Sequence, residues 1–112
     1  QMGTVGPMIG QHHQFHHYNP GKSEFGEKRY FEMAKKIYKE LDERLSVSKF
    51  LAGKDYTIAD IATFPWIARH EWHDVGLKNF KNLSRWYNEI SERDAVIKGF
   101  DLLNRDEKIP KV

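Results

Sequence analysis

One stretch, TIADIATFPWI at residues 57–67, limits what the chain can fold into more than any other. Thr57 can accept a hydrogen bond from the Asp60 amide while the Asp60 carboxylate reaches back to the Thr57 amide, which is the capping box that begins a helix. The helix that follows has almost no polar residue and therefore no face to present to water. We expect it at the buried centre of a domain. Thr57 and Asp60 are then structural residues, and losing the cap should cost about 0.5–2 kcal/mol.

The rest of the chain supplies amphipathic helices to surround such a centre. A first helix ends near Tyr18, because Asn19, Pro20 and Gly21 form a turn. A second begins after the N-cap Ser23, and others follow the central stretch. The predicted helices are a first one through residues 10–18, then 24–45, one from 57, one over 80–90, and a last one after residue 93.

The last helix is predicted with Asp94 as its N-cap and with an inward face, which consists of Val96, Gly99, Phe100 and Leu103. No stretch alternates apolar and polar residues over a useful strand length. The fold class predicted is therefore all-α, a helical bundle of about five helices, in one domain over residues 1–112.

Charge and composition narrow the possible partners. The 112 residues include 18 Lys and Arg against 16 Asp and Glu, a net charge of +2 with both signs interspersed, which argues against nucleic acid or an anionic membrane. There is no cysteine, so the chain contains neither a disulfide nor a thiolate nucleophile. No apolar run approaches the roughly 20 residues that cross a bilayer. We expect a cytoplasmic protein.

Four of the six histidines lie in the segment QHHQFHHYNP, residues 11–20. On a helix His12 lies over His16 and His13 over His17, the i, i+4 spacing that holds zinc in HExxH motifs. The glutamate of that motif and a nearby third ligand are both missing. His70 and His73 form a second pair with the same deficit. Solvated histidines are therefore favoured over a metal site, and no metal is predicted.

Several motifs together resemble the C-terminal helical domain of cytosolic glutathione transferases. They are Gly6-Pro7-Met8-Ile9-Gly10-Gln11 with the histidines after it, Glu27-Lys28-Arg29-Tyr30, and Phe50-Leu51-Ala52-Gly53 leading into Tyr56-Thr57-Ile58-Ala59-Asp60-Ile61-Ala62 and Pro65-Trp66. The capping-box stretch is the most specific of them, and it is a folding signal. The first two motifs point to the bacterial nu-class group and its fungal nitrogen-regulator relatives.

The resemblance implies that a thioredoxin-like domain upstream carries the catalytic group and most of the site for glutathione, the co-substrate. The helical domain alone is then inactive and contributes no catalytic residue. It forms the wall that faces an electrophilic or disulfide substrate, for glutathione conjugation or disulfide reduction, and most of a homodimer interface. The wall residues implied are Gln11, His12, Phe15 and His16. Arg29 is implied to reach the glutathione carboxylate of the neighbouring subunit, which suits its forked guanidinium.

The residues themselves leave alternatives open. Arg29 fits equally well as one of many solvated charges on its helix. The same helical fold also occurs as a non-catalytic protein-interaction module, which is the second hypothesis for the whole chain. Trp66 and Trp86 are interpreted as core residues, because no Arg or Lys cluster accompanies them as in a base-stacking surface. Trp72, between charged neighbours, is expected to face the cleft or the dimer partner.

Overall fold

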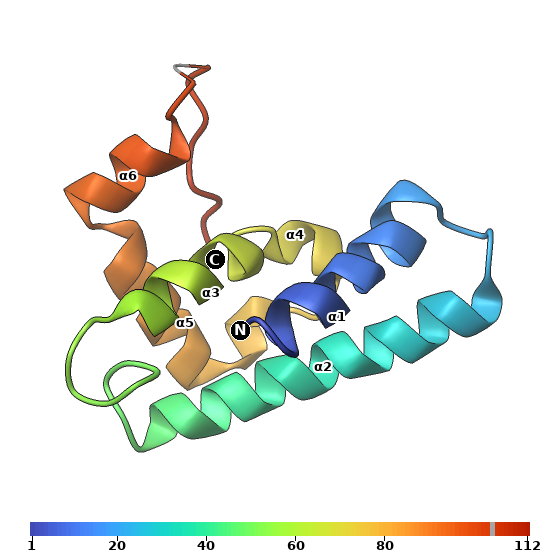
Figure 1. The fold of residues 1–112 in the computed structure, drawn as a ribbon, viewed down its shortest axis with the longest axis horizontal. Helices are drawn as coiled ribbons and strands as arrows, with labels where there is room; N and C mark the ends of the chain where they lie inside the picture. The colour runs from blue at the N-terminus through green and yellow to red at the C-terminus, as the bar shows by residue number, and fades with distance from the viewer. Residues whose placement is uncertain (104) are drawn as a thin grey trace.

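The computed structural model describes residues 1–103 and 105–112, and within them it contains helices, turns and one isolated bridge between Phe50 and Gly53 (Figure 1). This confirms the all-α prediction. The described part has six α-helices where about five were expected, because a short helix follows the central one. The elements are α1 (Val5–His12), the π-helix η1 (His13–Tyr18), α2 (Glu24–Ser46), α3 (Ile58–Ile67), α4 (His70–His73), the 3-10 helix η2 (Leu77–Asn79), α5 (Lys81–Ser91) and α6 (Asp94–Phe100).

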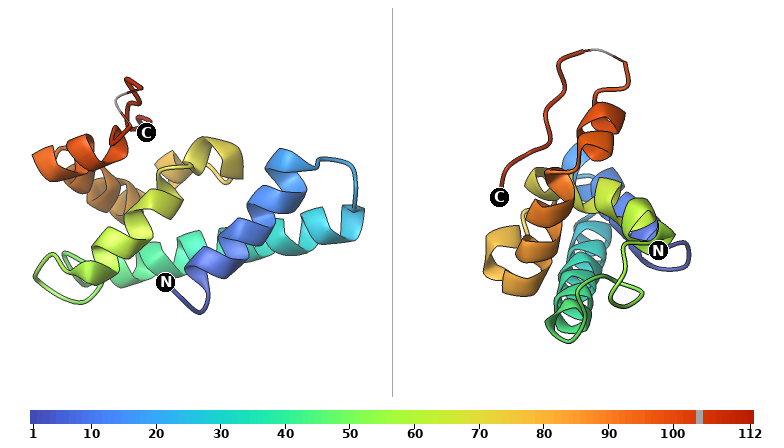
Figure 2. Two further views of the ribbon diagram at one scale, coloured as in Figure 1. Left: turned by 45° about the horizontal axis from the view of Figure 1, so that its top comes forward. Right: turned by 90° about the vertical axis from the view of Figure 1, so that its left-hand side faces the viewer.

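Helix α1 continues into η1, and together they run antiparallel to α2 along one side of the molecule. Helix α3 packs on the other side of α1, and α4 packs against η1 (Figures 1 and 2). Ser23 caps α2 by accepting a hydrogen bond from the Gly26 amide at 3.0 Å. The N-terminus of α5 is held by α2, because Asp42 accepts from the Asn82 and Leu83 amides at 2.8 and 2.9 Å. None of the described helices combines the length and apolar character that crossing a membrane requires.

Helix α3 begins with the capping box. Asp60 is fully buried, and its Oδ2 accepts from the Thr57 amide at 3.0 Å. Its Oδ1 accepts from the Leu51 amide at 3.0 Å and from the Trp86 indole at 2.7 Å. Asp60 therefore joins α3 to the preceding loop and to α5 as well as capping its own helix.

The expectation that α3 has no solvent face is wrong for this chain. Ile58 and Ile61 are 83% and 53% exposed, although Phe64 and Ile67 on the other face are buried. An apolar stretch indicates that burial of its surface is favourable. It does not indicate whether another part of the same chain covers that surface.

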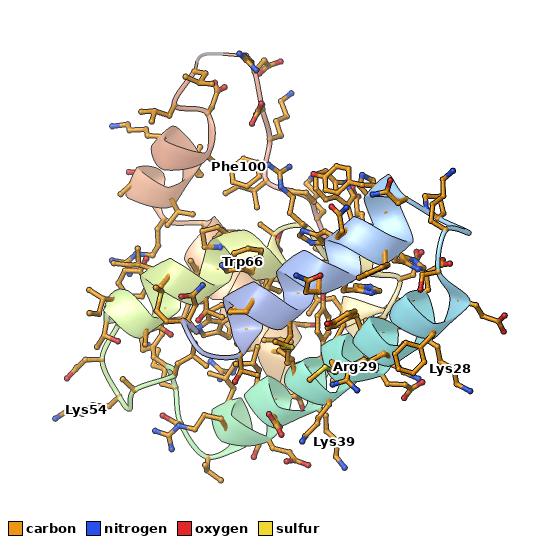
Figure 3. All side chains as sticks on the ribbon, turned by 45° about the vertical axis from the view of Figure 1, so that its right-hand side comes forward. Lys28, Arg29, Lys39, Lys54, Trp66 and Phe100 are labelled. Atoms are coloured by element: carbon orange, nitrogen blue, oxygen red, sulfur yellow. The ribbon has the colours of Figure 1, made fainter. Side chains whose placement is uncertain are left out.

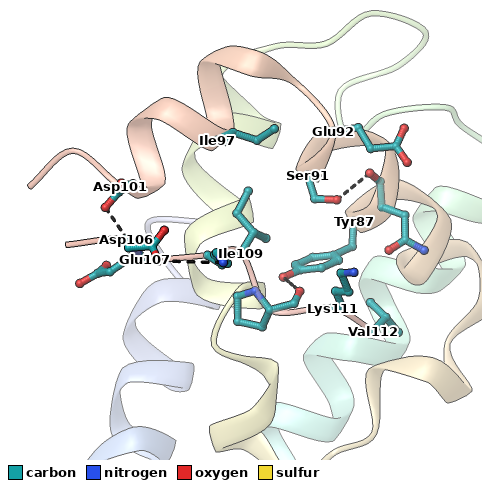
Figure 4. A pocket seen from close by; sticks show the side chains of 13 residues that line it. Tyr87, Ser91, Glu92, Ile97, Asp101, Asp106, Glu107, Ile109, Lys111 and Val112 are labelled. Carbon is teal, nitrogen blue, oxygen red and sulfur yellow. Dashed lines mark hydrogen bonds and ion pairs between the residues drawn. The ribbon is translucent and has the colours of Figure 1, made fainter. Parts of the chain in front are cut away.

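The last helix also differs from the prediction. Arg93 has the extended conformation of an N-cap, and Asp94 is the first helical residue with no side-chain cap bond. The helix ends at Phe100, and Gly99 and Leu103 are exposed, whereas Val96 and Phe100 pack on the core. The C-terminal tail returns to the domain, where the Tyr87 hydroxyl donates to the Pro110 carbonyl at 2.7 Å (Figure 4).

Candidate functional site

A buried cluster of histidines joins three elements that are far apart in the sequence. His12 and His13 come from the junction of α1 and η1, His73 from α4, and Tyr38 from α2. His12 Nε2 lies 2.9 Å from the His73 carbonyl oxygen, and His13 Nε2 lies 2.7 Å from His73 Nε2. The Tyr38 hydroxyl lies 2.6 Å from His73 Nδ1. His12, His73 and Tyr38 are completely buried, so the cluster forms a polar core inside the bundle.

The hydrogen-bonding partners of each imidazole determine which ring nitrogen carries the hydrogen. A carbonyl only accepts, so His12 carries its hydrogen on Nε2. Tyr38 is buried and has no other acceptor among the described residues, so its hydroxyl donates to His73 Nδ1. His73 must then carry its hydrogen on Nε2 and donate to His13. This assignment leaves His12 Nδ1 as a bare, buried acceptor with no protein partner in the described chain.

Burial keeps the cluster neutral. It lowers the pKa of His73 to about 2 and that of His13 to about 4, and the neighbouring histidines add to both shifts. Burial also lowers the pKa of His12, against the opposing effect of its bond to the His73 backbone. A proton on any of these rings would meet little water, and protons on two neighbouring rings would repel each other. The cluster is therefore suited to hold its elements in place at neutral pH.

Two further histidines of the π-helix η1, His16 and His17, extend from this buried cluster toward the surface. Such helices are rare and are frequent at functional sites. His16 stacks on His12 with ring centroids 4.8 Å apart, as the i, i+4 spacing predicted, and its Nε2 lies 2.6 Å from Asp74 Oδ2. The next ring, His17, stacks on Trp72 at 4.1 Å. Trp72 is partly exposed, and so is Trp66, which was interpreted as a core residue, whereas Trp86 is fully buried.

The structure separates the four predicted wall residues into two kinds. Gln11 is exposed, and Phe15 and His16 are partly buried, so these three contribute to the surface of α1 and η1. Phe15 stacks on Tyr30 with centroids 5.5 Å apart. His12, expected on the wall, is instead fully buried beneath His16, because its ring is held by the backbone of α4. It supports the surface from below.

Arg29 lies elsewhere, on the solvent face of α2 (Figure 3). It lines a shallow cavity of about 520 Å³ with Phe25, Lys28, Glu32 and Met33. It makes no ion pair with any described residue, and its guanidinium carbon is 6.0 Å from the centre of the Tyr30 ring. Phe25 beside it is 76% exposed. An unpaired arginine next to an exposed aromatic ring is a common composition for a protein interface.

Sequence reasoning missed Tyr38 and Asp74, and it took His73 only as half of an incomplete metal pair. Tyr38 has the spacing of an ordinary core residue, and Asp74 lies in a loop, so neither carries a local signal. Among the described residues, no group of three or more histidine or acidic side chains is placed to hold a metal ion.

Two further cavities lie on other elements. The larger, about 810 Å³, is formed by α5, α6 and the C-terminal tail (Figure 4). The other, about 510 Å³, lies between α3 and α6 and includes Arg69 and Arg93 with apolar side chains. Neither contains a residue of the histidine cluster.

Comparison with known proteins gives this geometry its context. The family model described as "Glutathione S-transferase, C-terminal domain" matches residues 5–94, from the start of α1 through α5. The chain belongs to this family. The narrower resemblance to the nu-class group stays a prediction.

The relatives of this glutathione transferase C-terminal domain include two proteins of Escherichia coli. The disulfide-bond oxidoreductase YfcG is 35% identical over 86% of this chain and 45% of its own length. The disulfide-bond oxidoreductase YghU is 38% identical over 76% of this chain and 32% of its own length. The chain therefore spans less than half the length of these relatives.

Solved structures agree with the domain in fold. A glutathione transferase from Burkholderia graminis, with two glutathione molecules bound per subunit, is 32% identical with a TM-score of 0.84, over 93% of this chain and 46% of that one. One from Pseudomonas putida, with one glutathione disulfide bound per subunit, is 35% identical with a TM-score of 0.77, over 88% of this chain and 45% of that one.

Proposed function

We propose that this chain is the helical domain of a glutathione-dependent enzyme that reduces disulfide bonds. The observation that carries the proposal is the similarity to two disulfide-bond oxidoreductases, together with a structural neighbour that binds glutathione disulfide. The catalytic group and most of the glutathione site then lie in the part of the protein that this chain does not span, and the helical domain by itself is inactive.

In this proposal the exposed surface of α1 and η1 is the wall of the substrate cleft. Gln11 offers an amide, Phe15 an apolar ring and His16 an imidazole, a mixture typical of sites that bind small molecules. His12 holds His16 from beneath through ring stacking. The neutral histidine cluster fixes η1 against α4, so that the wall is rigid before substrate binds.

Arg29 is proposed to bind the glutathione carboxylate across a homodimer interface formed by α2. Its position supports this role, because it is exposed and has no ion pair within the described chain. A guanidinium can form two parallel hydrogen bonds with a carboxylate. Exposed Phe25 and the adjoining Met33 supply apolar surface for the partner subunit.

A second candidate is conjugation of glutathione to an electrophile, in a protein of the same family. It is favoured by the similarity to proteins described as glutathione transferases, and the same cleft wall would bind the electrophile. The two activities differ in the bond that the glutathione sulfur forms, so they are separated by substrate.

The experiment uses the protein as its gene encodes it. Purified protein is assayed for glutathione-dependent reduction of bis(hydroxyethyl) disulfide and for conjugation of chlorodinitrobenzene. Turnover of the disulfide well above that of the electrophile supports the proposal, and the reverse ratio favours conjugation. Absence of both activities, with no glutathione binding by calorimetry, would instead favour a non-catalytic interaction module.

The Arg29→Ala variant tests the glutathione contact. Loss of a charged hydrogen-bond partner should weaken glutathione binding roughly 10- to 100-fold. Lys39→Ala is the matched control, because Lys39 is another exposed cation on α2, and its only ion pair in the described chain is with Glu43. Equal glutathione affinity in wild type and Arg29→Ala would remove Arg29 from the site, and sedimentation of both variants checks the dimer.

A further inference from the structure

The hydrogen-bonded pair formed by His16 and Asp74 has features that a structural tie does not require. The two side chains lie 58 residues apart in sequence and meet at 2.6 Å, between His16 Nε2 and Asp74 Oδ2. The His16 side chain is 28% exposed and that of Asp74 is 68% exposed, so the pair is open to solvent. In the described chain Asp74 forms no ion pair with lysine or arginine.

Irregular backbone presents both partners. His16 lies in the π-helix, and Asp74 adopts the left-handed conformation with φ of 52° at the C-terminus of α4. Asp is among the few residues other than glycine that adopt this conformation, and here it does so where α4 ends. The two irregularities come from different elements and converge on one hydrogen bond.

The His16 ring is also held in one orientation. It stacks on His12 at 4.8 Å and on Phe31 at 5.7 Å, with the Phe31 ring only 4° from parallel. A carboxylate accepts hydrogen bonds and does not donate them, so Nε2 of His16 carries the hydrogen. Its Nδ1 is therefore left as a bare base when the ring is neutral. Asp74 stabilises the imidazolium that forms once Nδ1 takes a proton, as a carboxylate does beside a catalytic histidine.

We propose that His16 and Asp74 are a proton-transfer dyad, in which His16 Nδ1 gives a proton to the leaving sulfur atom of a disulfide substrate. This inference rests on the proposed function. His16 is then a catalytic residue that the helical domain adds to the catalytic group proposed for the part of the protein that this chain does not span, and Asp74 is a positioning residue that acts through it.

The step balances without an added oxidant or reductant. The glutathione thiol loses its proton to water, and the resulting thiolate forms a new S–S bond with one substrate sulfur. The substrate S–S bond breaks, and the other sulfur leaves with the electron pair and takes a proton from Nδ1 of the His16 imidazolium, which then recovers one from water. Glutathione is oxidised to a mixed disulfide while the leaving sulfur is reduced to a thiol.

The test compares two disulfides that need this proton to different extents. An alkyl thiolate is a poor leaving group and benefits from protonation, whereas a nitrobenzoate thiolate is stable and leaves readily without a proton. Turnover is measured with bis(hydroxyethyl) disulfide and with dithiobis(nitrobenzoate), with the uncatalysed rates subtracted. The protein is wild type or His16→Gln, each as the gene encodes it.

His16→Gln should lower kcat/KM roughly 100-fold for the alkyl disulfide and less than about threefold for the aryl disulfide, since general acid–base catalysis contributes that much only where a proton must move. Asp74→Asn, which keeps an acceptor but removes the charge, should show the same selectivity with a loss of about tenfold for the alkyl disulfide. Thermal melting shows whether His16→Gln folds. If it folds poorly, Asp74→Asn provides the test by itself.

His17→Gln is the matched control, because this neighbouring histidine stacks on Trp72 and has no carboxylate partner among the described residues. It should change the two rates by the same factor. An equal loss for both disulfides in His16→Gln, or no loss, would overturn the dyad and leave the pair as a tie between η1 and α4. A wild-type protein inactive toward both disulfides would overturn the proposed function and the dyad with it.

Discussion

The domain contains two buried polar centres, and they differ in how completely their hydrogen bonds are used. Asp60 receives bonds from Leu51, Thr57 and Trp86, so both oxygens of its carboxylate have partners. The histidine cluster leaves His12 Nδ1 without a partner in the described chain and continues to the surface through the His16 ring. A saturated centre can only hold the fold together. A centre with spare acceptors beside an exposed pair can also take part in chemistry.

The largest expected effect comes from removing the saturated centre. Asp60→Ala leaves three donors without an acceptor in or near the core, so it should lower the free energy of unfolding by about 4 kcal/mol. This is more than the cap alone predicted, because Asp60 also binds Leu51 and Trp86. Urea unfolding measures the loss, and Thr57→Ala, which removes only the cap, should lose about 1 kcal/mol. Equal losses in the two variants would contradict the network.

The histidine cluster should instead make stability depend on pH. In the unfolded chain these rings have the ordinary pKa of 6.5, whereas in the fold the pKa of His13 is about 4 and that of His73 about 2. The unfolded state therefore binds more protons below pH 6.5, so stability is full above that pH and falls as the pH decreases toward the folded values.

From pH 6.5 to pH 5.5 the loss from His13 and His73 together should be about 2 kcal/mol, and His12 adds to it in the same direction. Urea unfolding at several pH values measures the slope. His13→Gln removes one titrating ring and should flatten the curve. A free energy of unfolding that stays constant over this range would show that the rings are not held neutral by the fold.

The smallest effect is expected from a single bond within the cluster. Tyr38→Phe removes the hydroxyl that donates to His73 Nδ1 and leaves that acceptor bare, at a cost of about 1 kcal/mol in the free energy of unfolding. Tyr87→Phe is the comparison, because its hydroxyl binds the partly exposed tail at Pro110 and should cost less. If Tyr38→Phe is as stable as wild type, the hydrogen bond from the Tyr38 hydroxyl makes no net contribution to the free energy of unfolding.

Much of the fold could be predicted because helix signals are local. The Ser23 cap, the turn at residues 19–21 and the periodicity of α2 and α5 depend on residues within a few positions of one another, and the structure places these helices within a residue or two of the prediction. The error at Asp94 is of the same scale. Arg93 takes the extended conformation of the cap, and Asp94 moves to the first helical position, where a negative charge is still favourable.

The candidate site was only partly predictable. Helical spacing predicted that His12 and His16 stack, and they do. It gave no indication that His12 is buried, because that depends on α4, whose His73 carbonyl lies 61 residues further along the chain. The apolar pattern of residues 57–67 also placed Ile58 and Ile61 in the core. The sequence of this stretch does not show whether another part of the same chain covers these side chains.

The sequence by itself determined where the helices lie and how they begin, because these properties depend on short-range hydrogen bonding and periodicity, and its motifs carried the resemblance to the family. Only the tertiary structure decided which histidines are buried and neutral and which one is exposed beside a carboxylate. Those outcomes require Tyr38, His73 and Asp74 to be brought to η1 from distant positions, and desolvation and pairing arise only once the helices have packed.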